Sequence, residues 1–204
     1  MKTNPIQFNT HYNYGNQATN TINLQCKTSQ QTIPLFPAKT NIINFTSNIK
    51  NIGLPAKNYD LNDKTILITG ATGTLGTAII KELLENYSPK EIIVFSRDEY
   101  KQYKMKQKFP KTSPIKYIIG DVRDENATLK ATKKADVIIH TAAMKHVNIC
   151  EENKEEAIKT NFFGTLNVIN SALNSATKRI ILISTDKAAN PENLYGKSKK
   201  WPKI

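Results

Sequence analysis

The sequence lacks the features that mark membrane-spanning, secreted or disulfide-rich proteins. No apolar run approaches the ~18–20 residues that cross a bilayer, and the N-terminus has no continuous apolar core of a signal peptide. Cys26 and Cys150 are the only cysteines, and their spacing is neither a metal-binding nor a redox spacing, which favours a reducing compartment. These absences predict a soluble, cytoplasmic protein without membrane association.

Arginine is scarce, although the formal net charge is +12. Arg97, Arg123 and Arg179 are the only arginines, and the lysines are scattered along the chain. Nucleic-acid binding needs clustered basic residues interleaved with aromatic ones. We therefore expect no nucleic-acid partner, and attribute the charge to a compositional bias toward Lys, Asn and Ile.

Acidic residues are absent before Asp60, and residues 1–60 consist mainly of Asn, Thr, Gln and Lys. Several prolines interrupt this segment, and no period of 2.0 or 3.6 is sustained between them. We predict that residues 1–60 form a polar, disordered tail, with strand-like content only in "TNIINFTSNI" at 40–49. The sequence gives no function for this tail.

From Lys64 onward, short apolar runs alternate with amphipathic segments. This alternation is typical of parallel strands with helices on both faces, so residues 61–204 are predicted to form a doubly wound parallel α/β sheet of about five strands. The expected strands lie at 64–70, 91–96, 115–121, 135–143 and 178–184, and the expected helices at 75–86, 98–109 and 154–173.

A glycine-rich turn, "TGATGTLG", separates the first expected strand from its helix. Glycines at Gly70, Gly73 and Gly76, with Thr74 and Leu75 between them, let the backbone turn tightly and approach a pyrophosphate at the helix N-terminus. A strand before the turn, a helix after it and a second strand about twenty residues on are the expected context. The turn predicts a Rossmann-type dinucleotide site.

The tip of the second strand indicates which dinucleotide binds. NAD enzymes usually carry an acidic residue there, for the ribose 2′-hydroxyl. This sequence has Ser96 and Arg97, a hydroxyl and a guanidinium suited to a 2′-phosphate, so we expect NADP rather than NAD. Asp98 keeps NAD as the alternative, and Arg97 has a second interpretation as a solvated residue at the start of a helix.

Candidate catalytic residues follow the fifth strand. Tyr195 and Lys199 are four residues apart, so on a helix they share a face, and an ammonium beside a phenol favours the phenolate that can take a proton from a substrate hydroxyl. Asp186 and Lys187 add two ionisable groups. These suit a dehydratase, which must move protons at two carbons besides the one that carries the oxidised hydroxyl. The alternative is a surface ion pair on a loop.

Six motifs together resemble the UDP-N-acetylglucosamine 4,6-dehydratase (inverting) family, in the polysaccharide-biosynthesis branch of the extended short-chain dehydrogenase/reductase superfamily. The resemblance covers residues 61–199. It implies an NADP-dependent lyase that oxidises carbon 4 of a UDP-sugar, removes water across carbons 5 and 6, and returns hydride to carbon 6, for surface-glycan synthesis. The motifs are "GATGTLG", "SRDE", "GDVRD", "AAMKHV", "KTNFFGTLNVINSA" and "STDKAANPENLYGKSK".

The resemblance also implies roles for individual residues. Lys187 would take the carbon 5 proton, Asp186 would serve the carbon 6 hydroxyl, and Tyr195 would act at carbon 4. The remaining implied residues lie along the cofactor: Asp121 and Val122 by the adenine, Thr141 and Ala142 by the nicotinamide ribose, Lys145 at the cofactor and substrate site, and Asn161 on the helix behind it. Asp121 has a second interpretation as the N-cap of the next helix.

The family's chains continue well beyond the Tyr-x-x-x-Lys helix, whereas this sequence ends in "KWPKI". We therefore expect a C-terminally truncated chain, a short and frayed helix from Leu194, and an open sheet edge that takes a second copy of the chain or a complementing chain. Taken alone, the chain is interpreted as an inactive fragment that at most binds a dinucleotide. A third hypothesis, an epimerase or reductase, is weakened by Asp186 and Lys187.

Overall fold

The computed structural model describes residues 25–28, 31–34 and 60–200, and the chain divides into two compact units, Met1–Asn58 with Ile204 and Tyr59–Lys203. In the first unit, β1 (Gln25–Thr28) and β2 (Gln31–Pro34) pair antiparallel. This hairpin was not predicted, because strands of four residues are too short to show a period. The segment 40–49, the final "WPKI" and most of the predicted disordered tail lie outside the described residues.

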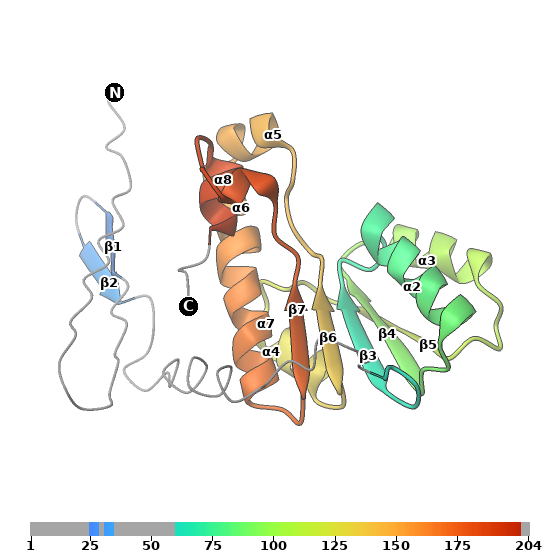
Figure 1. Ribbon diagram of the computed structural model, residues 1–204. Coiled ribbons are helices and arrows are strands. Elements are labelled where there is room, and N and C mark those ends of the chain that lie inside the picture. The colour runs from blue at the N-terminus through green and yellow to red at the C-terminus, as the bar shows by residue number, and fades with distance from the viewer. Residues whose placement is uncertain (1–24, 29–30, 35–59, 201–204) are drawn as a thin grey trace. The chain divides into compact units, whose positions relative to one another are not determined.

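The second unit contains a parallel sheet of five strands in the order β5-β4-β3-β6-β7 (Figure 1). All four neighbouring pairs are parallel. This order confirms the predicted doubly wound, Rossmann-type fold. The strands are β3 (Thr65–Thr69), β4 (Glu91–Ser96), β5 (Ile115–Ile119), β6 (Val137–His140) and β7 (Arg179–Leu182).

Helices connect these strands and extend beyond them. They are α2 (Thr74–Asn86), α3 (Glu99–Lys108), α4 (Glu125–Thr132), α5 (Val147–Glu152), α6 (Lys154–Ile158), the π-helix η1 (Lys159–Phe163), α7 (Gly164–Leu173), the 3₁₀ turn η2 (Asp186–Ala188) and α8 (Leu194–Lys199). In the part of the chain that the structure describes, none of them is long and apolar enough to span a membrane.

The sheet is buried on both faces, which explains why its central strands read as continuous apolar runs. On one face, Ile66 and Ile68 of β3 pack against α2 and α3. The other face is covered by α4 and α7 (Figure 1). There, Leu67 packs with side chains of both helices. Because Ile66, Leu67 and Ile68 are all fully buried, β3 forms the centre of the hydrophobic core.

The segment predicted as one helix, 154–173, is interrupted in the structure. A π-helical turn, η1, separates α6 from α7. A π-helical turn is a single wider turn within a helix, and the apolar spacing that predicted one continuous helix does not resolve so short an irregularity. Asn161, one of the predicted site residues, lies in this π-helical turn.

The order of the strands locates the site. Connections from β3 run to one side of the sheet and those from β6 to the other, so the carboxyl ends of β3 and β6 border the crevice where open α/β sheets bind ligands. Beyond the carboxyl ends of β6 and β7 lie α5 and α8 (Figure 1). The predicted cofactor and catalytic residues all come from this end of the sheet.

Candidate cofactor and catalytic site

The β3–α2 turn lies against the end of β6 and leaves no room for a side chain at its first glycine. Gly70 has a positive φ of 64°, and a Cβ atom there would be 2.7 Å from the backbone N and Cα of Ala142. The Gly70 N–H donates to the Phe95 carbonyl at 2.9 Å, and the Gly73 N–H donates to the Gly70 carbonyl at 2.9 Å. The close approach requires glycine at position 70.

Helix α2 begins at this turn with its N-terminus open. Its N-cap is Gly73, which makes no side-chain cap bond, and the first turn contains no acidic residue. A Cβ on Gly76 would be 2.5 Å from the Ala71 Cα, so helix and strand are in close contact. The positive end of a helix with uncapped N–H groups fits the diphosphate of a dinucleotide, and Thr74 and Leu75 lie in this first turn.

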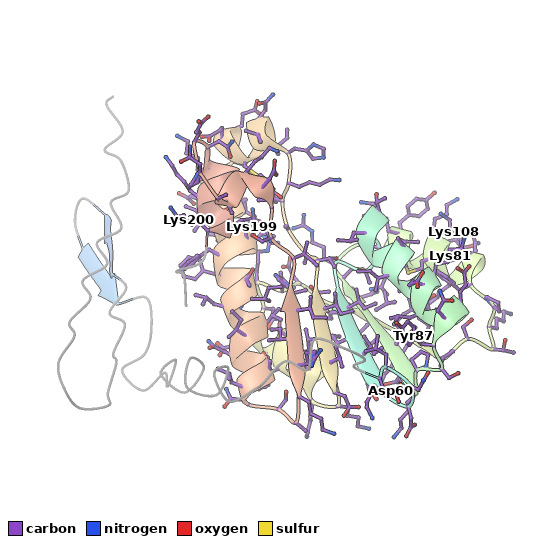
Figure 2. All side chains as sticks on the ribbon, in the orientation of Figure 1. Asp60, Lys81, Tyr87, Lys108, Lys199 and Lys200 are labelled. Carbon is purple, nitrogen blue, oxygen red and sulfur yellow. The ribbon has the colours of Figure 1, made fainter. Side chains whose placement is uncertain are left out.

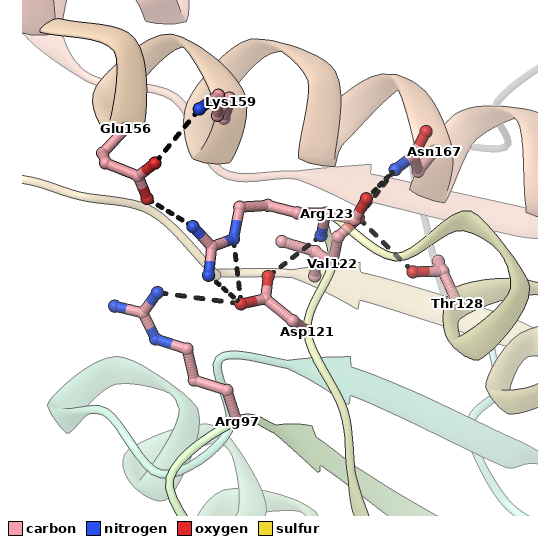
Figure 3. A network of polar contacts seen from close by, with 8 residues as sticks. All are labelled: Arg97, Asp121, Val122, Arg123, Thr128, Glu156, Lys159 and Asn167. Carbon is pink, nitrogen blue, oxygen red and sulfur yellow. Dashed lines mark hydrogen bonds and ion pairs between the residues drawn. The ribbon is translucent and has the colours of Figure 1, made fainter.

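The tips of β4 and β5 carry a network of charged side chains (Figure 3). The Arg123 Nε and Nη2 atoms donate to Asp121 Oδ2 at 2.9 and 2.6 Å, and Arg123 Nη1 binds Glu156. Arg97 Nη1 lies 3.7 Å from the same Asp121 oxygen. Glu156 in turn pairs with Lys159 at 3.4 Å. The sequence predicted Arg97 and Asp121 for this site, but not Arg123 or Glu156.

Asp121 is not the N-cap of the following helix, so that interpretation was wrong. Asp124 caps α4 by accepting the Ala127 N–H, whereas Asp121 accepts the Arg123 N–H. Burial opposes ionisation of Asp121, but the hydrogen bonds and charge of Arg123, with a smaller contribution from Arg97, outweigh it and lower the pKa of this carboxyl. Next to it, the Val122 carbonyl accepts the Asn167 side-chain amide at 2.9 Å (Figure 3).

The other two residues at the tip of β4 have local roles. Asp98 caps α3 by accepting the Lys101 N–H at 2.9 Å, and this hydrogen bond lowers the pKa of its carboxyl. Ser96 is buried, and its Oγ accepts a hydrogen bond from Gln102 Nε2 at 3.1 Å. The most exposed of the three side chains is Arg97, at 60%, compared with 38% for Asp98.

A chain of buried hydrogen bonds lies beneath the switch point. His140 is 1% exposed, with Nδ1 2.7 Å from Thr69 Oγ1 and Nε2 2.9 Å from Thr165 Oγ1. Because the Thr165 hydroxyl donates to the Asn161 carbonyl at 2.7 Å, it accepts from Nε2–H, and Nδ1 accepts from Thr69. Burial, with a smaller contribution from the charge of Lys199, lowers the pKa of His140 to about 3, so the imidazole is neutral.

Asn161 joins three parts of the site. Its Oδ1 accepts the Met144 N–H at 2.8 Å, and its Nδ2 donates to the Met144 carbonyl at 2.9 Å and to Ser198 Oγ at 3.0 Å. Met144 belongs to the β6–α5 loop that holds Thr141, Ala142 and Lys145, and Ser198 belongs to α8. A single buried amide therefore fixes the β6–α5 loop and α8 to each other.

Helix α8 is packed, although it has six residues, so the expected frayed terminus was wrong. Asn193 caps it by accepting the Gly196 N–H at 2.9 Å, and the Leu194 N–H donates to Glu151 of α5 at 2.7 Å. Lys199 is 4% exposed and its Nζ donates to the Ile183 carbonyl at 3.3 Å (Figure 2). Burial lowers the pKa of Lys199 to about 8.

The turn η2 lies against α8, because a Cβ on Gly196 would be 2.3 Å from the Lys187 carbonyl oxygen. The side chains of Asp186 and Lys187 are 83% and 47% exposed and form an ion pair of 3.4 Å. The Thr185 hydroxyl, which bonds Asp186 at 2.8 Å, and the neighbouring Lys187 lower the pKa of the Asp186 carboxyl. Lys145 is also exposed.

The structure brings the predicted residues together at one end of the sheet. It also adds residues that the sequence did not single out for the site, namely Gln102, Arg123, His140, Glu156, Thr165 and Ser198. Arg123, Thr165 and Ser198 lie inside recognised motifs, whereas Glu156 had no sequence signal. Within residues 60–200, no group of His, Cys, Asp or Glu side chains is arranged to hold a metal ion.

Known proteins resemble this chain over the same region. The sequence is 51% identical over 139 residues to a UDP-N-acetylglucosamine 4,6-dehydratase (inverting) of Campylobacter jejuni, a match that covers 68% of this chain and 41% of the relative. The chain therefore spans about two fifths of the length of this curated relative.

Two solved structures share the fold. Pen from Bacillus thuringiensis is 41% identical with a TM-score of 0.67, covering 70% of this chain and 44% of that chain. UDP-glucose 4-epimerase from Bifidobacterium longum, in complex with NAD+ and UDP, is 26% identical with a TM-score of 0.56, covering 66% and 45%. Residues 66–204 also match the model of one family. The chain belongs to the polysaccharide biosynthesis protein family.

Proposed function

We propose that this protein carries the cofactor-binding and catalytic part of an NADP-dependent dehydratase acting on UDP-N-acetylglucosamine. The observation that supports this is the placement of Tyr195 and buried Lys199 on a helix packed against the Asp186–Lys187 turn, in a chain 51% identical to an inverting 4,6-dehydratase. In this proposal residues 61–204 form the dinucleotide-binding domain, and residues 1–60 a separate tail.

The proposed reaction begins at carbon 4. Tyr195 takes the proton of the carbon 4 hydroxyl, and the Lys199 ammonium on the same helix face stabilises the phenolate. A nicotinamide cofactor held by the β3–α2 turn and the tip of β4 would supply the hydride acceptor for carbon 4 and the hydride donor for carbon 6, so no net oxidant would be consumed. Asn161, through Ser198, keeps this helix against the β6–α5 loop while the proton moves.

The elimination follows at carbons 5 and 6. The new ketone acidifies the carbon 5 proton, which Lys187 takes, while Asp186 gives a proton to the carbon 6 hydroxyl as it leaves as water. An ionised Asp186 cannot donate, and its bond from Thr185 favours ionisation. We infer that the sugar buries this turn and that its carbon 6 hydroxyl replaces Thr185, because both changes favour the protonated carboxyl.

NADP is the cofactor that the side chains favour. Arg97 is the exposed charge at the tip of β4, and Asp98, the residue that would favour NAD, is engaged as the N-cap of α3. The likeness to a structure that binds NAD+ supports a nicotinamide dinucleotide as the cofactor. The preference for a 2′-phosphate rests on the side chains at the tip of β4.

A partner strand beside β7 is part of the proposal. Ile181 of β7 is 42% exposed, and β7 lies at the edge of the described sheet. An exposed apolar edge strand is a template for pairing with a second copy or with a complementing chain.

An NMR assay in deuterated water tests this function. The purified chain is incubated with UDP-N-acetylglucosamine and NADP, and we expect a 4-keto-6-deoxy sugar with deuterium at carbon 5. Lys187→Met should reduce turnover by about 100-fold or more, whereas Lys197→Met, an exposed lysine on α8, should not. Protein that is folded and binds NADP but forms no product would refute the proposal and leave a dinucleotide-binding protein.

The runner-up function is that of a nucleotide-sugar epimerase, which the likeness to the Bifidobacterium longum enzyme favours. An epimerase also oxidises carbon 4 but eliminates nothing. In the same assay it would give the carbon 4 epimer with its carbon 6 hydroxyl intact and without deuterium at carbon 5. That result would identify Asp186 and Lys187 as a surface ion pair.

A further inference from the structure

We propose that Arg123 is a positioning residue that sets the preference for a 2′-phosphate, because it engages Asp121 and so leaves the charge of Arg97 available. The inference rests on the proposed cofactor site and goes beyond it, since Arg123 would act on the ligand through another residue.

The distances around Asp121 support this division of roles. Asp121 Oδ2 accepts two short hydrogen bonds from Arg123, at 2.9 and 2.6 Å, and Oδ1 accepts the Arg123 N–H at 3.0 Å. Arg97 approaches the same Oδ2 only to 3.7 Å. Two charged N–H donors at short distance hold this carboxylate oxygen more strongly than one contact at the longer distance does. The carboxylate is therefore engaged by Arg123.

Arg123 is held from both sides and has little freedom to contact a ligand itself. Its Nη1 atom binds Glu156 of α6, and Glu156 is also paired with Lys159 (Figure 3). The side chain of Arg123 is 33% exposed, compared with 60% for Arg97. Arg97 is thus the more accessible guanidinium of the network.

The charges explain how Arg123 would change selectivity. Asp121 and Arg97 alone form a neutral pair, which attracts a phosphate weakly. Arg123 also pairs with Glu156, which is in turn paired with Lys159, so the five charged side chains of this network carry one net positive charge (Figure 3). The more exposed of its two guanidinium groups is that of Arg97. Removal of Arg123 would let Asp121 draw Arg97 into a close ion pair, because an unpaired, partly buried carboxylate takes the nearest cation.

Binding of two small ligands tests the inference without catalysis. Adenosine 2′,5′-bisphosphate and AMP both fill the adenosine end of the site, and only the first has the 2′-phosphate. We expect the chain to bind the bisphosphate more tightly in calorimetry, and Arg123→Met to reduce this preference by about fivefold. Lys101→Met, a matched loss of an exposed cation on α3, should change the ratio much less.

Two double variants separate positioning from direct contact. If Arg123 acts through Arg97, Arg97→Met/Arg123→Met should have the same ratio as Arg97→Met alone. Asp121→Asn added to Arg123→Met should restore the ratio, because the competing carboxylate charge is gone. The positioning role would be overturned if the double variant Arg97→Met/Arg123→Met lost more of the preference than Arg97→Met alone. It would also be overturned if Asp121→Asn did not restore the preference.

The outcomes also distinguish this inference from the proposed function. If the wild-type chain prefers the bisphosphate and Arg123→Met retains that preference, the inference fails and the NADP proposal stands. If the wild-type chain binds both ligands equally, or neither, the proposed NADP site fails and the inference fails with it.

Discussion

The two parts of the candidate site differ in how their side chains are held. Around the β3–β6 switch point, His140, Asn161 and Lys199 are nearly inaccessible to solvent and bonded to partners far away in sequence. At η2, Asp186 and Lys187 are exposed and bonded mainly to adjacent residues. The side chains at the switch point are held in place by the fold alone, whereas those of η2 are held mainly by adjacent residues.

This difference predicts where substitutions affect stability and where they affect chemistry. A buried polar group that loses its partner costs free energy whether or not a ligand is present. An exposed ion pair contributes little to stability, so its side chains are free to be used by a substrate.

The largest effect is expected at the buried amide of Asn161. Asn161→Leu keeps the approximate volume but leaves the Met144 N–H and carbonyl without their partner, and should lower the free energy of unfolding by about 3 kcal/mol. Urea unfolding followed by circular dichroism measures this loss. Asn174→Leu, at the exposed C-cap of α7, should change the midpoint little. Equal effects of the two variants would contradict the joining role of Asn161.

A pH-dependent effect is expected at His140. Its pKa is about 3 in the folded chain and 6.5 ordinarily, so below pH 6.5 the unfolded chain binds a proton that the folded chain excludes. Stability from this residue is therefore complete above pH 6.5 and falls with pH, by about 2 kcal/mol at pH 5. His140→Gln should remove this part of the acid sensitivity, and exposed His146→Gln should not. Unfolding in urea at pH 7.5 and 5 measures it.

The contrast between the two parts also explains what the sequence predicts. The strands follow from local patterns, and the fold confirmed them. The glycine turn and the Tyr195–Lys199 pair also follow from local patterns, and their roles stay predictions. The partners of His140 are 71 and 25 residues away in the chain, and no local pattern encodes such pairs. Arg123 lies within a recognised motif, but its bond to Glu156 depends on where the fold places α6 relative to the loop after β5.

Lys199 should show a smaller effect of opposite sign. Burial lowers its pKa to about 8 from 10.5, so a desolvation penalty is complete below pH 8 and disappears as pH rises through 10.5. Lys199→Met removes that penalty and loses the bond to Ile183, so a net gain of about 1 kcal/mol is expected at pH 7. The gain should shrink between pH 7 and 9.5. If Lys199→Met were less stable than the wild type at pH 7, burial of the Lys199 ammonium would not cost the free energy that this prediction assumes. Lys197→Met is the control.

The smallest effect on stability is expected at Asp186, together with a large effect on turnover. The carboxylate is fully exposed, so Asp186→Asn should leave the urea midpoint unchanged, because water replaces the bonds from Thr185 and Lys187. The amide cannot donate an acidic proton, so elimination should slow by about 100-fold or more, while carbon 4 oxidation, seen as transient NADPH absorbance, persists. If carbon 4 oxidation and elimination were both lost, Asp186 would be needed to form the Tyr195 site. If the elimination rate were unchanged, Asp186 would have no role in the reaction.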